Sequence, residues 1–363
     1  DADGNVYPGM EPSCQSIAGY ISGTDVSEHS QIAVDMTTME ACLADDTACR
    51  TAAYVEGGGS VKGSGDDIRT IRGFALSGPS KMSEEPWYQL YSAYWDDEAY
   101  ADTFTLNACQ GTGQFAGLDD TALTELCEKG AVYQAIFMYV IHEMEDAIAD
   151  CRASDLNSNT DSVHAWDEAV AFYVGSEAGA EAGAADYGNL VYALAEKRCA
   201  NFGTCTGAQG QSAVNEKIMA SFAEGQALLA TYDCDGAELS KEAIVKQMLV
   251  PQMQGALRYL YQADPANCDG GECTAKEKAE LWAFAAAVLP AVDAASPAVA
   301  AQFRANSEYT TASPGVVGDG YAVVAAALQE VYSTMGFSCL DVGGLLDADG
   351  NVYPGMEPSC QSI

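Results

Sequence analysis

Positive charge is scarce in this sequence. Lys and Arg total 16 against 53 Asp and Glu, and the formal net charge is −37 over 363 residues. Nucleic-acid binders need clustered Lys and Arg to neutralise phosphates, so this composition excludes a generic nucleic-acid partner. Docking on anionic lipid is disfavoured for the same reason. Cations and basic surfaces are the neighbours that such a chain attracts.

Long apolar runs and catalytic signatures are missing as well. The most apolar stretch, residues 131–141, runs directly into the sequence HEMED, whereas a helix needs about 20 apolar residues to cross a bilayer. We therefore expect no membrane span. The sequence contains no G-x-S-x-G, no P-loop and no H-E-x-x-H motif, so we expect that the protein is not an enzyme.

Cysteine is abundant, but no C-x-x-C spacing occurs among the 13 residues. Zinc and iron–sulfur sites favour that spacing, so we favour disulfides formed in an oxidising compartment. This predicts an extracellular, cell-surface or periplasmic location. Spacing alone does not fix the connectivity. The close pairs that suit small loops are Cys42/Cys49, Cys199/Cys205 and Cys268/Cys273, and two looser pairs are Cys109/Cys127 and Cys151/Cys234.

The dominant periodicity is helical, and Ala-rich runs such as KEKAELWAFAAAVL contain strong helix formers. We therefore predict an all-α fold, a helical bundle stapled by disulfides. A shift of 112 residues aligns the apolar pattern of 131–138 with that of 243–250. This weak match suggests two related half-bundles, residues 18–200 and 201–346. Pro251 falls within a helical run, where it predicts a kink or a break.

The first 17 residues recur letter for letter as residues 347–363. We interpret residues 1–17 as the start of a repeat unit with its junction, and 347–363 as the start of the next unit. Adjacent copies of the unit are then the expected partners. Head-to-tail contacts of this kind generate filaments unless they close into rings. The resulting hypothesis is a structural repeat unit of a secreted tandem-repeat protein that forms an extracellular fibre or surface appendage.

The repeated segment also begins like a calcium-binding loop. Asp347, Asp349 and Asn351 occupy the first, third and fifth positions of an EF-hand-like pattern. The pattern then fails, because Val352 stands where Gly is needed and Pro358 where Glu is needed. The sequence thus leaves two interpretations open, calcium ligation at each junction or a plain acidic turn.

Histidine is rare, and two of the three histidines lie among acidic residues on predicted helices. Helical spacing places His142 on one face with Glu145 and Asp146, and His164 on one face with Asp167 and Glu168. If the two helices pair in an antiparallel hairpin, their side chains can share a site for iron or another divalent cation. Solvated helix faces and a pH-sensitive His–carboxylate pair are the alternatives.

The run SVHAWDEAVAFYVGSEAG at 162–179, and more loosely IHEMEDA at 141–147, resembles the algal iron-assimilation family of low-iron-inducible periplasmic proteins, which includes high-CO2-inducible relatives. The resemblance implies a secreted, helical, iron-responsive protein without enzymatic activity. Its motif carries over to His164, Asp167 and Glu168, with Glu177 nearby. The alternative function is therefore a secreted module that binds iron or another divalent cation in iron assimilation.

Overall fold

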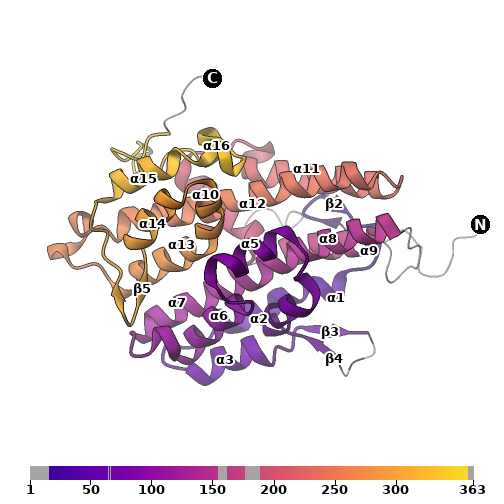
Figure 1. The fold of residues 1–363 in the computed structure, drawn as a ribbon, viewed down its shortest axis with the longest axis horizontal. Helices are drawn as coiled ribbons and strands as arrows, with labels where there is room; N and C mark the ends of the chain where they lie inside the picture. Colours follow the sequence, from indigo (N-terminus) through magenta and orange to yellow (C-terminus); the bar gives the residue numbers. More distant parts are fainter. Residues whose placement is uncertain (1–15, 64, 66, 154–161, 176–188, 359–363) are drawn as a thin grey trace, which may run out of the picture.

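The computed structural model describes residues 16–63, 65, 67–153, 162–175 and 189–358. These residues are mainly helical, which confirms the predicted all-α class (Figure 1). The α-helices are α1 (Ser27–Ser30), α2 (Ile32–Glu40), α3 (Thr47–Val55), α4 (Ile71–Ser77), α5 (Pro86–Trp95), α6 (Tyr100–Gln110), α7 (Asp120–Gly130), α8 (Phe137–Ala153), α9 (Ser162–Val174), α10 (Val191–Phe202), α11 (Ala213–Leu229), α12 (Cys234–Gln262), α13 (Ala275–Ala295), α14 (Pro297–Ala305), α15 (Tyr321–Gln329), α16 (Tyr332–Met335) and α17 (Cys339–Val342).

Short antiparallel hairpins, which the helical periodicity did not predict, connect some of the helices. They pair β1 (Ser16–Ile17) with β2 (Tyr20–Ile21), β3 (Ser60–Lys62) with β4 (Asp67–Arg69), and β5 (Tyr309–Thr310) with β6 (Ser313–Pro314). Each strand is only two or three residues long, so alternation over two residues is too short to stand out in a sequence.

Three features of the backbone determine where helices end or continue. Asp96 separates α5 from α6, because it ends α5 in the left-handed conformation with φ 50°. A π-helical segment, Ala131–Ile136, joins α7 to α8. Helix α12 continues through Pro251, so the predicted break is wrong, and the kink that was its alternative stays a prediction. Pro251 is buried, and packing of α12 on α11 and α13 offsets the hydrogen bond that proline removes.

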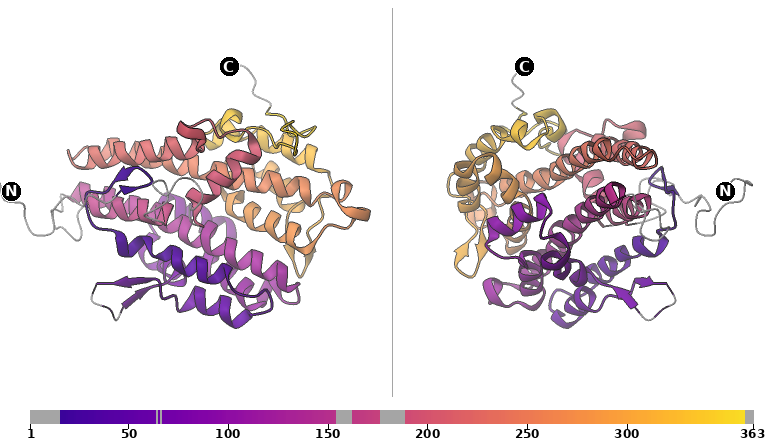
Figure 2. Two further views of the ribbon diagram at one scale, coloured as in Figure 1. Left: turned by 180° about the vertical axis from the view of Figure 1, so that it is seen from behind. Right: turned by 45° about the vertical axis from the view of Figure 1, so that its right-hand side comes forward.

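The core is one continuous cluster that extends from Ile17 to Met356. Helices α12 and α13 lie near its centre and pack on each other, and α8 packs on both α9 and α12 (Figure 2). A glycine permits the α12–α13 approach: a Cβ atom on Gly255 would lie 2.6 Å from the Phe284 ring. Both suggested half-bundles contribute to this cluster, and their relationship by duplication stays a prediction.

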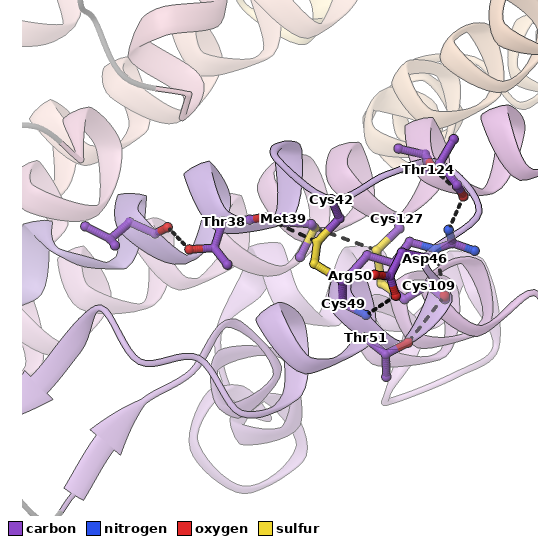
Figure 3. The surroundings of a disulfide bond; sticks show 12 residues. Thr38, Met39, Cys42, Asp46, Cys49, Arg50, Thr51, Cys109, Thr124 and Cys127 are labelled. Carbon is purple, nitrogen blue, oxygen red and sulfur yellow. Dashed lines mark hydrogen bonds between the residues drawn. A yellow bond between two sulfur atoms is a disulfide. The ribbon is translucent and has the colours of Figure 1, made fainter.

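Disulfides fasten loops and helix ends across the molecule. The bonded pairs are Cys42–Cys49, Cys109–Cys127, Cys151–Cys234, Cys199–Cys205 and Cys268–Cys273, the pairs that the spacing suggested. Cys339 is also disulfide-bonded. Figure 3 shows the first two bonds close together around α3. There the buried Arg50 donates hydrogen bonds to the carbonyls of Cys109 at 2.8 Å and Ala44 at 2.5 Å.

The elements around α9 create the environment for the candidate site. Helices α8 and α9 lie side by side, and α1 packs against α9 and β3 (Figure 1). Two hydrogen bonds fasten α1 to the β3–β4 hairpin: Ser60 Oγ donates to the Glu28 carbonyl at 2.6 Å, and the Gly63 amide donates to Glu28 Oε2 at 2.9 Å. This hairpin places Arg69 opposite Ser60, beside α1.

Candidate metal centre

His29, His164 and Glu168 come together where α1 packs against α9. The Nε2 atoms of His29 and His164 lie 3.1 Å and 3.0 Å from the Oε1 atom of Glu168. One ligand atom from each of the three residues lies within 4.8 Å of the others. His164 and Glu168 are one turn apart on α9, whereas His29 comes from a distant part of the chain. Within the described part of the chain, this is the group whose geometry suits a metal ion.

A second layer of hydrogen bonds orients His164. Its Nδ1 atom lies 2.9 Å from the Thr24 hydroxyl, which donates its own proton to Asp167 Oδ2 at 2.8 Å. The hydroxyl must therefore accept a hydrogen bond from Nδ1–H of His164. Because Nδ1 keeps its proton, Nε2 is the nitrogen that can bind a cation, and it then exchanges its hydrogen bond to Glu168 for the ion. The ring thus points its ligand atom toward Glu168 and His29.

Asp167 supports this layer rather than the cation group. Tyr20 donates to its carboxylate, as do Gln226 at 2.8 Å and the Thr24 amide at 2.8 Å. Burial raises the pKa of Asp167, and these hydrogen bonds act against that increase. Because both carboxylate oxygens are engaged on this side, Asp167 positions Thr24 and through it His164.

Arg69 faces the other imidazole. Its guanidinium donates a hydrogen bond to Nε2 of His29, the same atom that lies 3.1 Å from Glu168. That nitrogen can accept from Arg69 or donate to Glu168, but not both at once. The Nδ1 atom of His29 is buried and has no hydrogen-bond partner among the described residues. A cation bound at His29 Nε2 therefore has to displace the Arg69 guanidinium.

The pKa values of Glu168, in the cluster, and Glu143, in the neighbouring cavity wall, are shifted in opposite directions. Burial alone would raise the pKa of Glu168, but hydrogen bonds and positive charge from His164 and His29 hold it well below its ordinary value. Burial, together with the charges of Glu168 and Asp146, raises the pKa of Glu143 well above its ordinary value. The site therefore keeps a negative charge on Glu168, whereas its surroundings disfavour a negative charge on Glu143.

A cavity of about 700 Å³ opens beside the cluster, and His164 and Glu168 form part of its wall. Its lining carries charges of both signs together with the aromatic rings of Phe74 and Tyr139. The cationic side chains are Lys62, Arg69 and Lys81, and the acidic ones are Glu143, Asp146, Asp150 and Glu168. The cavity gives a hydrated cation a polar route to the ligand atoms.

The structure separates the predicted ligands into different environments. His142 points to α5 and pairs with Glu85 at 2.6 Å, and Glu145 pairs with the buried Lys241 at 2.6 Å. Asp146 lines the cavity wall, outside the group of three. Of the predicted set, His164 and Glu168 are the members that meet in a cation-binding geometry. Glu177 lies outside the described residues.

The junction residues form an acidic turn. The Asp347 carboxylate accepts hydrogen bonds from the amides of Asp349 and Asn351, both at 2.9 Å. These bonds lower the pKa of Asp347. The turn satisfies the carboxylate without an ion, and calcium ligation by the three residues stays a prediction.

Sequence reasoning missed His29, Thr24 and Arg69. His29 was the remaining histidine of the chain, and it has no motif spacing to His164 or Glu168. Its rarity was the available signal, because a chain with three histidines offers few imidazole ligands. Only the packing of α1 on α9 brings it to Glu168.

Residues 11–362 match the model of one protein family, described as Fea1, low iron-inducible periplasmic protein. This match confirms the resemblance suggested by HAWDEAVAFYVGS and leaves the tandem arrangement as a prediction. No curated protein and no solved structure gave a match. A periplasmic family and a set of disulfides confirm the expected extracellular or periplasmic location. No helix in the described segments is both long enough and apolar enough to span a bilayer.

Proposed function

We propose that this chain, which belongs to the Fea1 family of low iron-inducible periplasmic proteins, binds iron as cargo through His29, His164 and Glu168. The observation that carries the proposal is the convergence of two imidazole nitrogens and one carboxylate oxygen within 4.8 Å. Imidazole and carboxylate ligands together suit divalent iron and manganese, and they also accept zinc. The protein would then capture the ion for iron assimilation outside the cytoplasm.

The surroundings of the cluster support capture of a cation. The ionised Glu168 supplies a negative charge that is largely removed from water, and the hydroxyl of Thr24 fixes the orientation of His164. The whole chain carries a formal charge of −37, which raises the local concentration of cations around it. The cavity beside His164 gives the ion a path from solvent.

Family membership favours this function over the fibre-forming role. The fibre hypothesis rests on the identical segments 1–17 and 347–363, and it stays a prediction for electron microscopy. The absence of enzymatic activity also stays a prediction. A ligand set that leaves coordination positions free is compatible with cargo binding, because an ion that is to be released needs exchangeable ligands.

Calorimetric titration with Fe²⁺ under anaerobic conditions tests the proposal. We expect one ion per chain in the wild type, and loss of this binding in His164→Ala and Glu168→Gln. The matched control is His142→Ala, because His142 pairs with Glu85 away from the cluster. Unchanged binding in His164→Ala would contradict the proposal, provided that circular dichroism shows all variants folded.

A further inference from the structure

The segment 347–357 follows the last helix, α17, and packs against α15 (Figure 1). Leu346 and Val352 form an antiparallel bridge, and the Tyr353 amide donates to the Leu345 carbonyl at 2.9 Å. The Leu346 amide in turn donates to the Asn201 carbonyl at 2.8 Å, near the C-terminal end of α10. The backbone of this segment is therefore ordered by contacts with the body.

Side chains hold the segment in the same place. Tyr353 stacks on Tyr261 of α12, with ring centroids 4.2 Å apart, and Met356 is only 4% exposed. From α15, Tyr321 donates through its hydroxyl to the Pro354 carbonyl at 2.6 Å, and Gln329 donates to the Glu357 carbonyl at 3.1 Å. We call the surface formed by Tyr261, Tyr321, Gln329 and residues 344–346 the junction seat.

The junction seat fits this particular sequence. Gly355 has a φ of +81°, and a Cβ atom there would lie 2.7 Å from the Cβ atom of Ala322. Only glycine adopts this conformation readily, and only glycine avoids the clash. Gly344 of the seat is equally close, because a Cβ atom on it would lie 2.9 Å from Val352 Cγ1. The backbone conformation and the two apolar anchors of the segment, Tyr353 and Met356, thus account for its fit to the seat.

The same sequence occurs a second time in the chain, as residues 1–11. Tyr7 and Met10 correspond to the anchors Tyr353 and Met356. We propose that the junction seat of one copy of this unit takes residues 1–11 of a second copy. The partner is therefore the start of another unit, docked head to tail, and the junction between units is an ordered contact rather than a loose linker. This inference goes beyond cation binding and does not depend on it.

Geometry favours a second copy over the same chain. The β1–β2 hairpin, which follows the first segment, and α15 of the junction seat lie toward opposite ends of the molecule in both figures (Figures 1 and 2). In the intact chain the tethered residues 347–357 fill the seat at an effective concentration on the order of millimolar, so a free copy competes poorly. Weakening the tethered segment should therefore reveal the exchange.

Sedimentation equilibrium of four full-length proteins tests the proposal. They are the wild type, a seat-releasing variant with Tyr353→Ala and Met356→Ala, a variant with Tyr7→Ala and Met10→Ala, and a variant with all four changes. We expect the seat-releasing variant to associate as concentration rises, with an average mass about twofold or more above that of the four-fold variant. The Tyr7/Met10 variant should match the wild type, because its tethered segment still fills the seat.

Two outcomes would overturn the proposal. One is a seat-releasing variant that stays monomeric at every concentration while circular dichroism and a cooperative melt show it folded. The other is association that persists in the four-fold variant, in which Tyr7 and Met10 are also replaced. The exposed seat would then be associating non-specifically, without recognising the repeated segment. Association of the seat-releasing variant, together with its loss in the four-fold variant, supports exchange of the repeated segment between copies.

Discussion

Nδ1 of His164 lies 2.9 Å from the hydroxyl oxygen of Thr24, although the two residues are 140 positions apart in the sequence. The hydroxyl in turn donates a hydrogen bond to Asp167 Oδ2 at 2.8 Å. This relay fixes the tautomer of His164 and the direction of its Nε2 atom. For the proposed centre we therefore expect the cation affinity to depend also on residues that do not contact the ion.

Breaking the relay should weaken cation binding while the three ligands remain. We expect Thr24→Val and Asp167→Asn to lower the affinity for Fe²⁺ by roughly 10- to 100-fold, the usual cost of losing a partner behind a metal-bound histidine. Anaerobic calorimetry measures the change. Thr38→Val is the control, because Thr38 only donates to a carbonyl of its own helix, that of Val34. Wild-type affinity in Thr24→Val would contradict the role of the relay.

The candidate centre was half readable from sequence. His164 and Glu168 are one helical turn apart, so local periodicity alone places them on one face. His29 joins them through the packing of α1 on α9, a contact that no local spacing encodes. His142 and Glu145 are three positions apart, so local periodicity places them on one helix face as well. However, α8 turns them toward Glu85 and Lys241 instead.

The disulfide between Cys151 and Cys234 should matter more for stability than the one between Cys268 and Cys273. The first joins residues 83 positions apart, from the end of α8 to the start of α12, and the second joins residues 5 apart. Chain entropy in the unfolded state predicts losses of about 4–5 kcal/mol and about 2 kcal/mol when both cysteines of a pair become Ala. Urea unfolding measures both, and equal losses would contradict the entropic explanation.

Glu128 should make stability depend on pH. Burial, helped by the charges of Glu125 and Glu40, raises the pKa of Glu128 from its ordinary value of 4.5 to about 7. The folded state therefore binds a proton that the unfolded state has released, and the free energy of unfolding falls as pH rises through this interval. We expect Glu128→Gln to be more stable than the wild type by roughly 1–3 kcal/mol at about pH 8, and little changed at about pH 4.

Urea unfolding at the two pH values measures this effect. The control is Glu272→Gln, which makes the same charge change at an exposed position and should alter the free energy of unfolding little at either pH. An equal gain in both variants at the higher pH would assign the effect to net charge rather than to the burial of Glu128.

Fold class and the three short disulfide loops were suggested by sequence because both rest on local features. Ala-rich helical runs specify helices, and short spacings such as Cys199–Cys205 limit the partners of each cysteine. The β3–β4 hairpin and the continuation of α12 through Pro251 were not readable. Strands of three residues leave almost no periodicity, and tertiary packing overrides the helix-breaking tendency of a buried proline.

X-ray absorption spectroscopy of the Fe²⁺-loaded protein tests the central claim most directly. The account predicts a first shell of mixed nitrogen and oxygen ligands, with the outer-shell scattering of two imidazole rings. One ring should disappear in His29→Gln and one in His164→Gln, while His142→Gln keeps both. A shell made only of oxygen, or imidazole scattering that is unaffected by His29→Gln and His164→Gln, would contradict binding at His29, His164 and Glu168.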